Sequence, residues 1–245
     1  MHDVLVVVGT RPEAIKLAPV VRRLTEVDGI RPIVLGTGQH PEMTREMTRL
    51  FDVGHDADLD VHTRGQTLPQ LLARVVSGVG AVMDDVKPSA VIVQGDTTTT
   101  LGAALAAVTS ELPLVHLEAG LRSGDLRNPF PEELNRRAIA PVAALHLAAT
   151  PDNRSALLRE GIPADRVATV GNTVIDAFNW VRSLNRPWDD ASLAAFCEAT
   201  DSRARPVVLV TMHRRESWGE PTEAVAHAVR SVAAARPDLR VVWPV

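Results

Sequence analysis

The sequence has few of the residues that mark several classes of protein. Cysteine occurs once, at Cys197, so no disulfide can form within the chain, and a reducing compartment fits this composition. No basic neighbour would activate the Cys197 thiol, and we expect a half-buried packing side chain there. Lys16 and Lys87 are the only lysines. A lysine close to a ligand site therefore stands out more here than in a lysine-rich chain.

Long apolar runs and blocks of like charge are also absent. No window approaches the roughly 18 apolar residues that span a bilayer, and the N-terminus enters a strand at Val4–Val8 without a basic and apolar leader. The net charge is −4 with no block of Lys or Arg, which predicts neither a nucleic-acid nor a membrane partner. With 45% apolar and 23% charged residues, we expect an ordinary globular, cytoplasmic protein.

Short apolar runs alternate with amphipathic stretches along the chain. This pattern is typical of βαβ units with a parallel sheet, so the predicted fold class is α/β. The expected strands are Val4–Val8, Pro32–Gly36, Ala90–Val93, Leu114–Leu117, Leu145–Ala148 and Val167–Val170. The expected helices are Pro12–Val27, Pro41–Leu50, Leu68–Asp85, Thr98–Thr109, Glu132–Ala140 and Asp152–Glu160.

A smaller set of elements follows a connection at Arg182–Ser202. The pattern restarts with a strand, a helix and a strand near Pro206–Thr211, Thr222–Ala235 and Leu239–Trp243. Two strands and one helix cannot cover both faces of a parallel sheet. We therefore expect a truncated two-domain protein, with a first domain over residues 1–180, a connection over 181–205 and the start of an incomplete second domain over 206–245.

Three predicted strands end in charged side chains. Val91–Asp96 reads VIVQGD, Val115–Gly120 reads VHLEAG, and Val207–Glu216 reads VVLVTMHRRE. Because parallel strands bring their carboxyl ends to one edge of the sheet, where open α/β proteins bind ligands, we expect these side chains to share a crevice. Glu is disfavoured in strands, which favours a functional Glu118. Asp96 also fits a helix N-cap, and the sequence leaves both roles open.

The turn after the first strand has the features of an anion site. Gly9–Lys16 reads GTRPEAIK, with Thr10 and Glu13 at capping-box spacing. Free N–H groups and the helix dipole at such a turn attract anions, and Arg11 can reach over it. A capped helix without a ligand is the simpler interpretation and stays open. The segment is neither G-x-G-x-x-G nor a Walker A loop, so it predicts neither nicotinamide nor ATP binding.

Two further segments carry candidate residues. Leu121–Arg137 is a polar loop that leads into a helix beginning with Glu132 and Glu133, and we expect at most one of these glutamates in a site because adjacent residues face different ways. His213 stands beside two arginines at a strand end and is a candidate for gripping or protonating a phosphate-bearing group. His116 alternates to the other face of its strand and is interpreted as a residue that packs in the core or supports the site residues from behind. The sequence has no metal-ligand spacing and no nucleophile elbow.

Seven strings resemble the UDP-N-acetylglucosamine 2-epimerases, especially the bacterial non-hydrolysing type. They occur in the family's order over nearly the whole chain, so the combination is specific although each string alone is weak. The strings are Gly9–Val20 (GTRPEAIKLAPV), Thr37–His40 (TGQH), Gln94–Leu101 (QGDTTTTL), His116–Arg122 (HLEAGLR), Pro129–Arg136 (PFPEELNR), Gly171–Ala177 (GNTVIDA) and Val210–Ser217 (VTMHRRES).

The resemblance implies two Rossmann-like domains in a GT-B-like fold, a UDP-sugar bound between them, and a homodimer. It implies a reaction with neither metal nor nicotinamide cofactor, in which the proton on sugar C2 is removed as UDP leaves C1 to give a 2-acetamidoglucal. Protonation on the other face and return of UDP yields UDP-N-acetylmannosamine, which would feed a cell-surface polymer. Carboxylates for proton transfer and cations for a departing pyrophosphate fit this chemistry.

Residue roles follow from positions in the matching strings. The implied catalytic residues are Asp96, Glu118, Glu132 and His213, the last as a contact to the UDP phosphates. The implied substrate-binding residues are Arg11, Lys16, His213, Arg214 and Arg215. Gln39 and Arg64 resemble an activator site for a second UDP-N-acetylglucosamine, with Glu42 where the family often has Gln.

Other functions fit part of the pattern. A hydrolysing epimerase would release UDP and free N-acetylmannosamine, and a glycosyltransferase of the same architecture would need an acceptor site in place of three carboxylates. A chain without activity could act as a binding or oligomerisation module, which would form hetero-oligomers with the intact enzyme. The family's nucleotide-binding loops beyond Val241–Val245 have no counterpart here, so we expect little turnover from these 245 residues alone.

Overall fold

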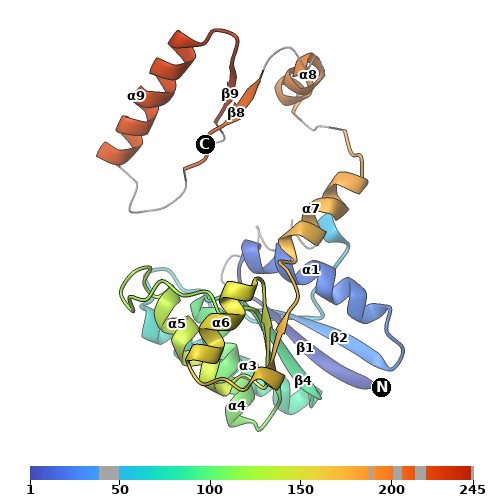
Figure 1. Ribbon diagram of the computed structural model, residues 1–245. Helices are drawn as coiled ribbons and strands as arrows, with labels where there is room; N and C mark the ends of the chain where they lie inside the picture. The colour runs from blue at the N-terminus through green and yellow to red at the C-terminus, as the bar shows by residue number, and fades with distance from the viewer. Residues whose placement is uncertain (39–49, 188–189, 201–205, 213–218, 244–245) are drawn as a thin grey trace. The chain divides into compact units, whose positions relative to one another are not determined.

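The structure, a computed structural model, describes residues 1–38, 50–187, 190–200, 206–212 and 219–243. The chain forms two compact units, an N-terminal unit at Met1–Leu184 and a C-terminal unit at Asn185–Val245. The N-terminal unit contains a seven-stranded sheet, and the C-terminal unit contains a separate two-stranded sheet (Figure 1).

The strands of the N-terminal sheet are all parallel, in the order β3-β2-β1-β4-β5-β6-β7. They are β1 (His2–Val8), β2 (Ile30–Gly36), β3 (Ala57–Asp58), β4 (Ala90–Gln94), β5 (Leu114–Ala119), β6 (Leu145–Ala148) and β7 (Val167–Thr169). The chain adds β2 and β3 on one side of β1 and then crosses to β4 on the other side. The loops after β1 and β4 therefore leave the sheet side by side where the strand order reverses, the position at which open α/β sheets bind ligands.

Helices cover both faces of this sheet. They are α1 (Arg11–Thr25), α3 (Leu68–Val86), α4 (Thr98–Thr109), α5 (Glu132–Ile139), α6 (Pro151–Arg159) and α7 (Val174–Ser183). Side chains of α3 and α4 share one core cluster with the strands, and side chains of α1 and α7 share a second cluster on the other face. The sheet is thus the middle layer of three.

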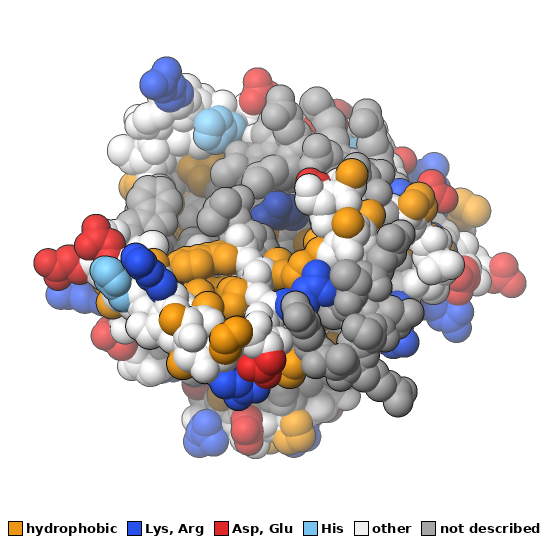
Figure 2. Space-filling model, turned by 90° about the horizontal axis from the view of Figure 1, so that it is seen from above, with side chains coloured by type: hydrophobic (Ala, Val, Ile, Leu, Met, Phe, Trp, Pro, Cys, Tyr) orange, Lys and Arg blue, Asp and Glu red, His pale blue; other side chains and the backbone are white. Residues whose placement is uncertain are grey.

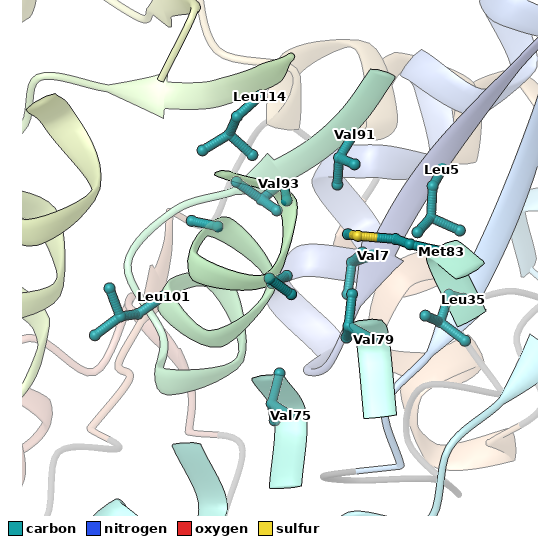
Figure 3. Packing of buried hydrophobic residues seen from close by; sticks show 14 of the residues in the cluster. Leu5, Val7, Leu35, Val75, Val79, Met83, Val91, Val93, Leu101 and Leu114 are labelled. Carbon is teal, nitrogen blue, oxygen red and sulfur yellow. The ribbon is translucent and has the colours of Figure 1, made fainter. Parts of the chain in front are cut away.

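The strands are apolar because both of their faces are buried. In β1, Leu5 and Val7 belong to the cluster with α3 and α4, whereas Val6 belongs to the cluster with α1. Figure 3 shows the first cluster, in which Val79 and Met83 of α3 lie against the β1 side chains. A continuous apolar run, rather than an alternating one, is the expected sequence of such a strand.

The described residues of the C-terminal unit form α8 (Ala191–Thr200), β8 (Val207–Leu209), α9 (Glu220–Ala235) and β9 (Arg240–Val242). β8 and β9 pair in parallel on either side of α9 in the sequence, which makes them one βαβ unit. The β8 residues are exposed, and Cys197 in α8 is half-buried. The guanidinium of Arg240 lies 3.8 Å from the centre of the Phe196 ring.

The sequence pattern misses one strand and one α-helix among the described residues of the N-terminal unit. The other strands and helices expected there occur within a few residues of their expected bounds, and Thr98–Thr109 matches α4 at both ends. β3 has only two residues, too few for a pattern. α7 has apolar residues at helical spacing, Val174, Ala177, Phe178 and Val181, a signal that could have revealed it. The helix expected over Pro41–Leu50 lies almost wholly outside the described residues.

Charged side chains of both signs are spread over the surface. Figure 2 shows acidic and basic side chains interspersed among the described residues of the face that it presents, without a large patch of one sign. This distribution agrees with the small net charge of −4. Of the helices that the structure describes, none combines the length and apolar character needed to cross a membrane.

Two helical glycines predict opposite effects of the same substitution. A Cβ at Gly102 of α4 would lie 2.8 Å from Cβ of the buried Val75, so Gly102→Ala should lower the free energy of unfolding by about 1 kcal/mol, because overpacking exceeds the gain in helix propensity. A Cβ at Gly80 of α3 would meet nothing within 4 Å, so Gly80→Ala should raise the free energy of unfolding by about 0.5–1 kcal/mol. Denaturant unfolding followed by circular dichroism measures both, and equal shifts of one sign would contradict the close α3–α4 packing.

Candidate functional site at the carboxyl edge of the sheet

A cavity of about 200 Å³ lies at the carboxyl edge of the N-terminal sheet. Its walls come from the β1–α1 loop and first turns of α1, the β4–α4 loop, the end of β5 and one side chain of α5. These segments meet where the strand order reverses between β1 and β4. Among the candidate residues, the cavity brings together Lys16, Asp96 and Glu118, and Arg136 of α5 joins them.

Glu118 occupies the end of β5 in an uncommon backbone conformation. Its φ is +59°, in the left-handed region that favours glycine, and the register between β5 and β6 shifts at this point. Oε2 accepts hydrogen bonds from Lys16 Nζ at 2.5 Å and from the Gln94 amide. Oε1 accepts one from the Asn172 amide at 2.8 Å. A cation and two amides thus hold the carboxylate in one orientation.

Asp96 follows β4 and is held by a cation from α5. The Arg136 guanidinium donates from Nε and Nη2 to Asp96 Oδ2, at 2.7 and 2.6 Å, and Asn135 donates to the Asp96 backbone carbonyl at 2.7 Å. Arg136 also donates to Glu133 at 3.1 Å. Burial opposes the charge on Arg136, but the two carboxylates raise its pKa above the ordinary value. The cation therefore stays charged and fixes the Asp96 side chain.

The adjacent glutamates at the start of α5 have different surroundings. Glu133 is fully buried, accepts from the Ser123 N–H at 3.0 Å and pairs with Arg136. Burial alone would raise the pKa of Glu133, but these donors lower the pKa overall. Glu132 is half-buried, does not line the cavity and has no hydrogen bond among the described residues. Glu133 therefore fastens the preceding loop to α5, which leaves Glu132 as the candidate for chemistry.

Glu13 is a buried carboxylate that the sequence assigns only a capping role. Its Oε2 accepts hydrogen bonds from the N–H groups of Gly9 and Thr10, at 2.6 and 3.2 Å, and its Oε1 accepts one from the Thr97 hydroxyl at 2.6 Å. Burial raises the pKa of Glu13, and these hydrogen bonds oppose the rise. Glu13 thus joins the β1–α1 loop to the β4–α4 loop at the cavity wall. Its capping-box spacing from Thr10 was the only signal in the sequence.

His116 lies buried behind the loop that carries Asp96. Its Nε2 donates to the Gly95 carbonyl at 2.7 Å, and its ring meets the ring of His146 edge to face at 6.3 Å. Burial lowers the pKa of each histidine to about 4. Both rings are therefore neutral at pH 7, and His116 packs behind the site as its position in the strand predicts.

Comparison with known proteins decides the family. The sequence profile of UDP-N-acetylglucosamine 2-epimerase matches residues 22–245. The chain belongs to this family. A UDP-N-acetylglucosamine 2-epimerase from Yersinia pestis is 44% identical over 244 residues, which are 99% of this chain and 65% of the relative. The enzyme of that name from Escherichia coli (strain K12) is 42% identical, again over 99% of this chain and 65% of the relative. The chain thus spans just under two thirds of these relatives' length.

Solved structures of epimerases share the fold. A Neisseria meningitidis UDP-GlcNAc 2-epimerase bound to UDP-GlcNAc superposes with a TM-score of 0.88 at 38% identity, over 99% of this chain and 65% of that chain. A Staphylococcus aureus MnaA–UDP co-structure superposes with a TM-score of 0.88 at 36% sequence identity, over 100% of this chain and 62% of that chain. The fold is therefore the α/β, GT-B-like type with two Rossmann-like domains, of which the second is represented here by β8, α9 and β9.

Several residues that the epimerase resemblance implicates lie away from the cavity. Arg11 is exposed at the first position of α1, and Arg64 is exposed in the loop before α3, and neither lines the cavity. The candidates outside the described residues are Gln39, His213, Arg214 and Arg215. Within the described part of the chain, no three His, Cys, Asp or Glu side chains are grouped as metal ligands.

The neutral state of His116 predicts an acid-dependent loss of stability. Between pH 6.5 and 4 the unfolded chain binds a proton at His116 and the folded chain does not, so the free energy of unfolding should fall as the pH is lowered through this range. His116→Gln keeps a donor for the Gly95 carbonyl but cannot titrate. Denaturant unfolding at pH 6.5 and 5 should show a shallower pH dependence in the variant, by up to about 1.4 kcal/mol per pH unit. Parallel pH dependences would contradict this account.

Proposed function

We propose that this chain is part of an enzyme that interconverts UDP-N-acetylglucosamine and UDP-N-acetylmannosamine by epimerisation at C2. The observation that carries the proposal is the pairing of two carboxylates with two cations at one cavity, Glu118 with Lys16 and Asp96 with Arg136. Membership of the epimerase family supports it, as do the relatives whose structures contain UDP-GlcNAc or UDP.

In the proposed reaction a carboxylate takes the proton from sugar C2. The C1–O bond to UDP breaks with its electron pair leaving on UDP, and a C1–C2 double bond forms to give 2-acetamidoglucal. UDP then adds back at C1 while an acid delivers a proton to the opposite face of C2. Atoms and charges balance in both directions. Because the proton leaves one face of C2 and arrives on the other, the reaction needs proton acceptors and donors on two faces, and cations for the departing diphosphate.

The available side chains match these needs. The proposed acid and base carboxylates are Asp96, Glu118 and Glu132. Lys16 and Arg11 lie in the first turns of α1, whose N-terminal N–H groups favour an anion, and we assign them to the diphosphate. The further proposed contacts are His213, Arg214 and Arg215 to UDP, and Gln39 and Arg64 to an activating second UDP-N-acetylglucosamine.

We also propose a homodimer, and in each chain a first domain over residues 1–180, a connection over 181–205 and the start of a second domain over 206–245. The chain spans 65% of the length of the Yersinia pestis relative. We therefore expect little turnover from the 245 residues alone, and turnover once the remaining third is supplied.

Incubation with UDP-N-acetylglucosamine in D2O tests the function. Proton NMR should show UDP-N-acetylmannosamine with deuterium at C2 in the 245-residue chain continued with the remaining third of the Yersinia pestis relative, and much less in the chain alone. Release of UDP and free N-acetylmannosamine would identify a hydrolysing enzyme instead. Absence of exchange in both forms would refute the proposed function.

Substitution of the paired carboxylates tests their role in the same assay. Asp96→Asn and Glu118→Gln should each lower the rate of deuterium incorporation by about 10²–10⁴-fold, because each removes a proton-transferring group. Glu26→Gln is the matched control, since Glu26 is exposed and pairs with Arg23 away from the cavity. Rates in both carboxylate variants equal to that of the control would rule out the assigned chemistry.

A further inference from the structure

The loop between β7 and α7 supplies a side chain that contacts a candidate catalytic carboxylate. Asn172 lies in this loop and is half-buried. Its Nδ2 donates to Glu118 Oε1 at 2.8 Å, across 54 positions of sequence. The matching string Gly171–Ala177 marks the family, but neither its composition nor its spacing gives Asn172 a role.

The Asn172 amide is held at both ends. Its Oδ1 accepts the backbone N–H of Val174, the first residue of α7, at 3.0 Å. Because that N–H requires an oxygen, the amide nitrogen is the atom left to face Glu118. The first turn of α7 therefore orients the amide, and the amide in turn directs a donor at the carboxylate.

The donors on Glu118 are divided between its two oxygens. Lys16 and Gln94 both donate to Oε2, and among the described residues the donor at Oε1 is Asn172. Two contacts on one oxygen leave the carboxylate plane free to turn about that oxygen. A third contact on the other oxygen fixes the plane.

We propose that Asn172 is a positioning residue that sets the direction of the Glu118 carboxylate for proton transfer. The inference rests on the proposed epimerisation and adds a residue to that site. The simpler interpretation is that Asn172 only caps α7 through Val174. The two interpretations predict different exchange rates for a variant that keeps the cap on Val174 but places an acceptor, instead of a donor, beside Glu118.

Asn172→Asp makes that distinction. The introduced carboxylate still accepts the Val174 N–H and suits a helix N-terminus. Its second oxygen, however, replaces a donor with an acceptor beside Glu118 Oε1, and two carboxylates at this distance favour a shared proton. Besides Glu118, the titratable and charged groups that line the same cavity are Glu13 and Lys16 from α1, Asp96 from the β4–α4 loop and Arg136 from α5. His116 on β5 is neutral at pH 7.

The test is the pH profile of C2 deuterium exchange, measured with the 245-residue chain continued with the remaining third of the Yersinia pestis relative. In Asn172→Asp the exchange rate at pH 8 should fall by about tenfold to a hundredfold and should recover at lower pH, where a proton bridges the two carboxyl groups. Asn172→Ala should lose rate without this shift in the profile. Asn153→Asp is the control, because Asn153 lies in the first turn of α6, accepts a hydrogen bond from the Thr150 hydroxyl and does not line the cavity.

Carboxyl NMR of the chain supplies a measurement that does not depend on activity. With ¹³C-labelled glutamate, and the Glu118 signal assigned by its loss in Glu118→Gln, Asn172→Asp should raise the pKa of the Glu118 carboxyl while thermal unfolding stays near that of the wild type. An unchanged Glu118 titration, or a wild-type pH profile in an Asn172→Asp variant, would overturn the proposal. A wild-type enzyme that exchanges no deuterium would refute the proposed function instead, whatever the titration shows.

Discussion

Two ion pairs fix the geometry of the candidate site. Lys16 and Glu118 lie 102 positions apart in the sequence, and Arg136 and Asp96 lie 40 apart. The four side chains are shielded from water, with exposures between 10% and 26%. A shielded charge without its partner is strongly destabilising, whereas a pair with good geometry is tolerated. The segments that carry these residues can therefore pack in few arrangements, and those arrangements bring carboxylates and cations to one cavity.

The ion pairs depend in turn on the order of the strands. Because β1 lies between β2 and β4, the first helix and the loop that carries Asp96 start from neighbouring strands. Glu13 joins these two starting points through the Gly9 N–H and the Thr97 hydroxyl. The buried apolar faces of the sheet supply most of the stability that offsets the desolvation of the charges. The packing of the core thus determines where the charged side chains of the site lie.

Much of this arrangement is predictable from local pattern, and the part that is not arises from tertiary contacts. The strand around Val4–Val8 and the helix Thr98–Thr109 are predictable because burial of both sheet faces requires apolar side chains, and these are visible in the sequence. The positions of Asp96 and Glu118 at strand ends follow from the same runs. Their partners Arg136 and Asn172 do not, because the packing of α5 and of the β7–α7 loop against the sheet edge leaves no periodic signal. The left-handed backbone of Glu118 is equally invisible in sequence.

We propose that sugar C2 exchanges its proton in the cavity between Lys16, Asp96, Glu118 and Arg136. A crystal structure with UDP-N-acetylglucosamine tests it most directly, through the distance from C2 to the nearest carboxylate oxygen. We expect C2 to lie about 3–3.5 Å from an oxygen of Asp96 or Glu118, the carboxylates of the two ion pairs at this cavity, with the diphosphate toward the first turns of α1. A sugar bound away from this cavity, with C2 beyond the reach of both carboxylates, would contradict this proposal.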